Sequence, residues 1–122
     1  MAIEDLVKKT LNSVEGIEAI AVYTADGKLV YATEGWTGGE DGKNGINAWN
    51  SDADEFVLGG DKYIVLRKDE EVLVATHSEK GPLLLSKSET GKYVIFAKLR
   101  PGAEMGLIRV ELSDLAYKIE KA

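Results

Sequence analysis

The amino-acid sequence predicts an α+β sandwich of the α/β class, built on a five-stranded, mainly antiparallel sheet. Three observations lead to this prediction: an amphipathic helix at each end, two hairpin signals between them, and strands that are apolar on both faces. The chain has 122 residues, of which 44% are hydrophobic, so it can form one core and needs no second domain. We therefore expect a single domain over residues 1–122.

The first predicted element is a helix near the amino terminus. Apolar side chains recur at intervals of three and four residues from Ile3 to Val14, and Gly16 follows them. Each aliphatic side chain that such a stripe buries contributes about 1.5–3 kcal/mol. The stripe therefore predicts a helix that docks on a sheet.

Two hairpins are predicted next. The strand-like runs 17–23 and 28–33 flank an Asp-Gly pair, which favours a tight turn because glycine accepts positive φ. The runs 62–68 and 71–77 turn at an Asp-Glu pair. A fifth strand is predicted over residues 92–99.

The segments between these strands are less regular. Residues 34–50 are rich in glycine and asparagine, but Ile46 and Trp49 have helical spacing, so a short helix over 43–51 and a loop both remain open. Residues 78–90 exceed a hairpin turn, and their run of three leucines either packs back on the body or adds a short strand.

A second amphipathic helix closes the chain. A Pro-Gly pair precedes it, apolar residues recur from Met105 to Ile119, and Lys118 and Lys121 lie in its last turn. Two terminal helices would cover one face of the sheet, and a short central helix would lie on the other. The central segment is too small to cover that face, so we expect a partner or a second copy to complete it.

Composition narrows the function classes. The net charge of −6 argues against nucleic acid as the main partner, and the absence of cysteine excludes disulfides. Residues 1–14 lack the apolar run of a signal peptide, and no segment approaches membrane-spanning length. We expect a cytoplasmic protein that does not insert into membranes.

No catalytic, cofactor or metal site is predicted. His77 lies beside Ser78, but no third residue orients such a pair, so it is interpreted as an ordinary strand-end histidine. The spacing of Asn50, Asp52 and Asp54 resembles a calcium loop, but Glu55 stands where that loop needs glycine. The protein is therefore expected to act by binding and not as an enzyme.

With these elements the chain resembles the roadblock family, named for a dynein light chain and including bacterial and archaeal regulators of Ras-like GTPases. The similarity covers nearly the whole length. It is carried by residues 11–17, the hairpin 23–30, the strand pair 63–75 and the entry to the last helix at 105–109.

The resemblance implies a single roadblock-like domain that forms a homodimer, or a heterodimer with a paralogue. The third strands, residues 62–68, would pair across a two-fold axis, and the central helices would pack on the open face. The dimer would bind a small Ras-like GTPase without supplying catalytic residues. The expected dimer or partner interface comprises Ile46, Trp49, Phe56, Tyr63, Val65 and Arg67.

Two features depart from the roadblock pattern, namely the glycine-rich central segment and the long connection over residues 78–90. A sheet with helices on one face also resembles longin, profilin and ligand-sensing domains. The alternative prediction is therefore a longin- or profilin-like module that binds a protein or a small ligand.

Overall fold

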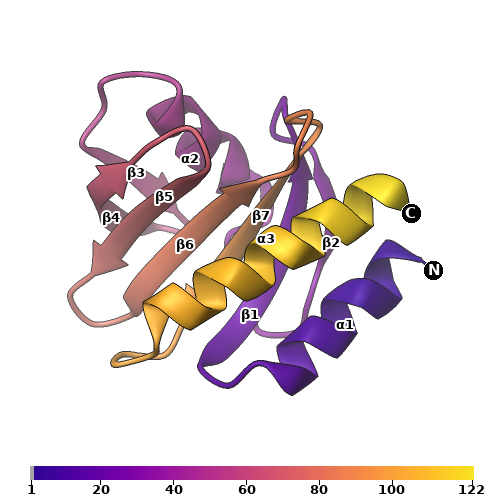
Figure 1. Cartoon of the computed structure of the whole chain (residues 1–122). Coiled ribbons are helices and arrows are strands. Elements are labelled where there is room, and N and C mark those ends of the chain that lie inside the picture. Colours follow the sequence, from indigo (N-terminus) through magenta and orange to yellow (C-terminus); the bar gives the residue numbers. More distant parts are fainter. Residues whose placement is uncertain (1) are drawn as a thin grey trace.

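The computed structural model describes residues 2–122 and contains a seven-stranded sheet with the order β2-β1-β7-β6-β5-β4-β3 (Figure 1). All neighbouring strands are antiparallel. The elements in chain order are α1 (Ile3–Ser13), β1 (Ile17–Thr24), β2 (Leu29–Ala32), the 3-10 helix η1 (Gly39–Asp41), α2 (Gly42–Trp49), β3 (Glu55–Leu58), β4 (Asp61–Lys68), β5 (Val72–His77), β6 (Gly81–Lys87), β7 (Tyr93–Leu99) and α3 (Met105–Lys121).

The two terminal helices lie side by side on one face of the sheet, as the sequence predicts (Figure 1). Their apolar stripes meet strands β1, β6 and β7 in a first core. Val7 of α1 and Ile108, Leu112 and Leu115 of α3 are fully buried there. The helical spacing in the sequence therefore marks the residues that dock each helix.

The sheet has two strands more than the five predicted. Strand β6 contains the three-leucine run and lies between β5 and β7, where it is buried on both faces. A strand of this kind is uniformly apolar and lacks the alternation that marks a half-exposed strand. Strand β3 has only four residues, so its alternating pattern was too short to be recognised.

The second face of the sheet is covered by the chain itself, contrary to the prediction that a partner is needed. Helix α2 and the segment around it form a second core with Tyr23, Leu73 and Phe96. A side chain at Gly42 would overlap the Tyr23 ring, and a Cβ at Gly45 would lie 3.0 Å from the Phe96 ring. The glycines thus let a short helix pack close enough to fill this side.

The sheet also contradicts the predicted strand pairing between two copies. Residues 62–68 belong to β4, which is hydrogen-bonded to β3 on one side and to β5 on the other. A strand with both edges used has no free ladder for a second copy. Within residues 2–122, no helix is long and apolar enough to cross a membrane.

Candidate functional site: an open face of the sheet

Helices α1 and α3 leave one end of their sheet face uncovered, over strands β3 and β4 and the adjoining part of β5 (Figure 1). Phe56 and Tyr63 pair directly across β3 and β4, and both are buried in the second core. Since successive side chains alternate between faces, Val57 and Ile64 point to the helix side. Each is 43% exposed, because no helix covers this region.

A β-bulge in β4 adds two more side chains to this surface. The register shifts between Val65 and Arg67, which leaves Leu66 as the extra residue. The shift interrupts the alternation of side chains along β4, so Leu66 and Arg67 both project to the face that carries α1 and α3. Lys68 faces the other way, where its ammonium donates a 2.8 Å hydrogen bond to the carbonyl oxygen of Ala48 in α2. Leu66 is 62% exposed.

Charged groups border the apolar surface where the β4–β5 turn approaches α3. The Asp69 carboxylate lies 3.5 Å from the Arg67 guanidinium and 3.9 Å from that of Arg109, which is 3.6 Å from Glu71. The same carboxylate accepts backbone N–H bonds from Glu71 and Val72, and these bonds hold the pKa of Asp69 below its usual value. Asp69 therefore stays ionised and keeps both arginines at the border.

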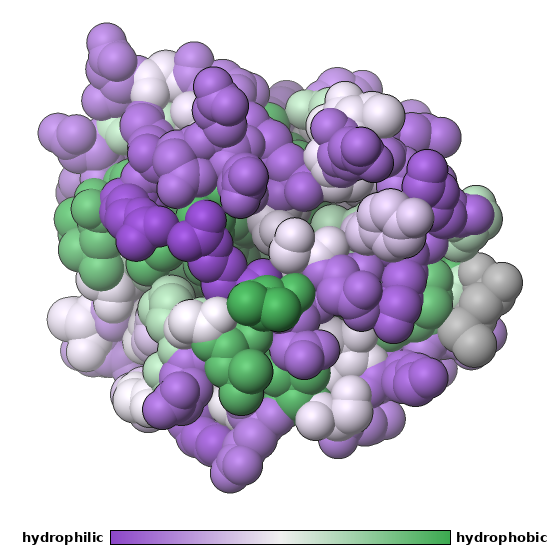
Figure 2. All heavy atoms as spheres, viewed as in Figure 1, coloured by the Kyte–Doolittle hydropathy of each residue, from purple (hydrophilic) through white to green (hydrophobic). Residues whose placement is uncertain are grey.

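We call this surface the open face. It comprises Glu55, Val57, Lys62, Ile64, Leu66, Arg67, Val74, Arg109 and Val110, and it includes the 3.5 Å ion pair between Lys62 and Glu55. Figure 2 shows hydrophobic residues gathered at the left of the molecule, over the end of the sheet that holds β3 and β4. The open face thus combines exposed aliphatic side chains with a charged border.

The expected interface residues are mostly interior. Ile46, Trp49, Phe56 and Tyr63 are 3–7% exposed and belong to the second core, and Val65 packs against that core. Only Arg67 lies on the open face. The alternation along β3 and β4 marks Val57 and Ile64 as exposed. Leu66 is exposed because of the bulge, and no sequence pattern indicates that bulge.

Trp49 has a defined interior role. Its indole N–H donates a 2.7 Å hydrogen bond to the carbonyl oxygen of Asp69, and the Lys87 ammonium lies 4.2 Å from its ring centroid. The other tryptophan, Trp36, donates to the hydroxyl of Tyr23 at 3.0 Å. Both indoles therefore pack in or against the second core, each with its N–H hydrogen-bonded.

His77 is part of a turn. Its Nδ1 accepts backbone N–H bonds from Glu79 and Lys80 at 3.1 and 3.0 Å, and its ring lies 5.6 Å from that of Tyr63. With Nδ1 occupied as an acceptor, this side chain organises the β5–β6 turn. Over the described range 2–122, no three His, Asp or Glu side chains are grouped so that they could hold a metal ion.

Comparison with known proteins identifies the fold. No family model matches the chain. Odin profilin from Odinarchaeota yellowstonii (strain LCB_4) is 22% identical over 121 residues, which cover 99% of this chain and 98% of that protein. The crystal structure of LokiProfilin1 superposes with a TM-score of 0.84 at 23% identity and covers 98% of this chain and 95% of its own. The complex of LokiProfilin2 with rabbit actin gives 0.81 at 26% identity, covering 98% and 97%.

These matches correct the resemblance drawn from the sequence. The relatives are profilins, so assignment to the roadblock family was wrong, and with it the expected Ras-like GTPase and the roadblock-type dimer. The two architectures share an antiparallel sheet with terminal helices on one face, which is why element order alone could not separate them. The comparisons support the alternative prediction of a profilin-like module over the roadblock one. The chain has the profilin fold.

Proposed function

We propose that this chain is a binding protein whose open face docks on a protein of the actin family. The observation that carries the proposal is the exposed aliphatic group Val57, Ile64 and Leu66 on a sheet region that no helix covers. Profilins of the same fold supply the partner class, since LokiProfilin1 and LokiProfilin2 both form complexes with rabbit actin.

The composition of the open face suits such a contact. Protein interfaces combine an apolar centre with a polar border, and a few central residues carry most of the binding energy. Leu66, at the bulge, is the most exposed aliphatic side chain that β3 and β4 contribute, and Arg67 and Arg109 lie beside Asp69 at the border. Both arginines lie within 3.9 Å of the Asp69 carboxylate, and exposed ion pairs of this kind are weak enough for a partner's carboxylate to replace them.

A titration of rabbit actin monomers by isothermal calorimetry tests the proposal. Leu66→Asp should weaken binding by about 2 kcal/mol or more, roughly thirtyfold, because a carboxylate would replace an apolar anchor. The matched control is Leu29→Asp, since Leu29 is 40% exposed on β2 at the opposite edge of the sheet. Binding that is lost in the Leu29 variant and kept in the Leu66 variant would reject the open face as the docking surface.

A further inference from the structure

The side-chain amide of Asn44 is chemically reactive because a glycine follows it. The chain contains four asparagines, and only Asn44 precedes a glycine. In such a pair the backbone nitrogen of the glycine can attack the asparagine Cγ, because the glycine has no side chain that obstructs the approach. A bond forms between that nitrogen and Cγ, the bond from Cγ to Nδ2 breaks, and Nδ2 leaves as ammonia with the proton of the backbone amide. Water then opens the resulting succinimide ring to aspartate or isoaspartate.

Helix α2 prevents this attack in the native structure. Asn44 and Gly45 both lie inside the helix, where ψ is about −42°. The Gly45 nitrogen reaches Cγ only when ψ of Asn44 rotates far from that value, and this rotation breaks the first turn of the helix. The Asn44 amide is also held, since its Nδ2 donates a 2.9 Å hydrogen bond to the carbonyl oxygen of Val57 in β3. Asn44 is exposed to solvent, so the geometry limits the reaction and the access of water does not.

The second core fixes the backbone of Gly45. A Cβ at this position would lie 3.0 Å from the Phe96 ring and 3.3 Å from the Phe56 ring. Packing this close leaves little room for the peptide bond between Asn44 and Gly45 to rotate while α2 is docked. Reaction at Asn44 therefore requires α2 to move away from β3 and the second core.

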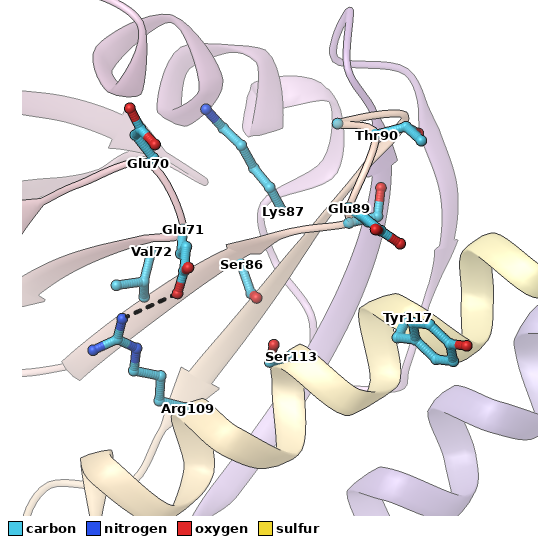
Figure 3. Close-up of a pocket in the computed structure, with 12 residues that line it drawn as sticks. Glu70, Glu71, Val72, Ser86, Lys87, Glu89, Thr90, Arg109, Ser113 and Tyr117 are labelled. Carbon is cyan, nitrogen blue, oxygen red and sulfur yellow. Dashed lines mark ion pairs between the residues drawn. The ribbon is translucent and has the colours of Figure 1, made fainter.

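The sequence of α2 is typical of a segment that opens locally. The helix has eight residues, four of which are glycine or asparagine, so it is too short and too poor in helix formers to be stable alone. Its docking depends on a few contacts: Ile46 and Trp49 are buried, and the Lys87 ammonium lies 4.2 Å from the Trp49 ring centroid. Figure 3 shows Lys87 leaving β6 on the side away from α3. Segments held by few contacts open at a lower free energy than the whole fold.

We propose that Asn44 is a covalent modification site that deamidates when α2 detaches from β3 while the rest of the sheet stays folded. In the isoaspartate product the backbone runs through the former side chain and gains a methylene group, so the first turn of α2 cannot re-form around it. Both products lack Nδ2, and the Val57 carbonyl loses its hydrogen-bond donor. Formation of isoaspartate therefore detaches α2 from β3 permanently. This proposal does not depend on the actin-family partner.

Peptide mapping by mass spectrometry of the full chain, incubated at neutral pH, tests the proposal. In guanidinium chloride, which unfolds the chain, Asn44 should deamidate faster than Asn12, Asn47 and Asn50, because only Asn44 precedes glycine. In native buffer the rate at Asn44 should be lower by about tenfold or more, because only the minor, open form reacts.

Two matched variants separate local opening of α2 from unfolding of the whole chain. Ile46→Val removes one methylene group from α2, and Ile108→Val removes the same group from α3, and both isoleucines are buried. A change of this kind favours opening of its own helix by roughly two- to tenfold. We expect Ile46→Val to raise the native rate at Asn44 by that factor and Ile108→Val to leave it unchanged. Thermal unfolding establishes that both variants are folded, and all three proteins should react at the same rate in guanidinium chloride.

Three results would overturn the proposal. The first is a rate at Asn44 that is the same in native buffer and in guanidinium chloride, because α2 would then offer no protection. The second is a native rate that Ile46→Val does not raise. The third is an equal increase in both variants, which would place the reaction in the globally unfolded chain.

Discussion

The indole N–H of Trp49 donates a hydrogen bond to the backbone carbonyl of Asp69, and the two atoms are 2.7 Å apart. Trp49 ends helix α2 on one side of the sheet, and the Asp69 carboxylate holds Arg67 and Arg109 on the other. The β4–β5 turn is therefore fixed from both faces. This bond connects the interior packing of the central segment to the charged border of the open face.

The first prediction concerns Trp49 as a core residue. Trp49→Ala should lower the free energy of unfolding by about 3–5 kcal/mol, because a large buried side chain is removed. Trp49→Phe keeps most of the apolar volume and loses the hydrogen bond to Asp69. The loss of that bond should lower the free energy of unfolding by about 1 kcal/mol, and poorer packing would lower it further. Urea denaturation measures both. If Trp49→Ala leaves stability unchanged, Trp49 is not part of the core.

The second prediction concerns the glycines under α2. A Cβ at Gly42 would overlap the Tyr23 ring, so Gly42→Ala should destabilise the protein by about 1–3 kcal/mol through overpacking. The control is Gly106→Ala in α3, where a Cβ would meet nothing within 4 Å. That change should stabilise the helix by up to about 1 kcal/mol. Thermal melts should therefore shift in opposite directions for the two variants.

The third prediction is a pH dependence that comes from Asp69. Its pKa lies below the ordinary value of 3.8, chiefly because the backbone N–H groups of Glu71 and Val72 bind the carboxylate. The unfolded chain therefore binds more protons than the native protein near that pH. The stabilisation is fully present above about pH 5 and is lost as the pH falls through the native pKa.

Asp69→Asn removes this titration. The difference in urea midpoint between the original protein and this variant should be constant from pH 8 to about pH 5 and shrink below about pH 4. Asp52→Asn, in the exposed stretch before β3, removes one carboxylate elsewhere on the surface and provides the control. A difference for Asp69→Asn that is the same at every pH would show that its carboxylate does not favour the native state.

Much of the fold is predictable from particular residues. The helical stripes that begin at Ile3 and Met105 correspond to α1 and α3, and the Asp26-Gly27 pair lies in the turn between β1 and β2. The sequence does not show how deeply a strand is buried in the sheet. Leu83, Leu84 and Leu85 do not alternate because β6 is buried on both faces, so periodicity could not identify a strand.

The candidate site was harder to predict, for two physical reasons. Trp49 and Ile46 lie in a polar, glycine-rich segment, which suggests a loop, whereas Gly42 and Gly45 are there to let that segment pack closely on the core. Leu66 projects outward because of a bulge, and a bulge has no sequence pattern of its own here. Hydrophobic residue type therefore selects Ile46 and Trp49, which are buried, and does not distinguish Leu66, which is exposed.

Docking of an actin-family protein on the open face is tested most directly by methyl NMR of the protein with Ile, Leu and Val methyl groups labelled, recorded while rabbit actin monomers are added. We expect the methyl signals of Val57, Ile64 and Leu66 to shift or broaden, while those of Leu29 and Val30 at the opposite edge of the sheet do not. Perturbation of the Leu29 and Val30 signals, with those of Ile64 and Leu66 unchanged, would contradict it.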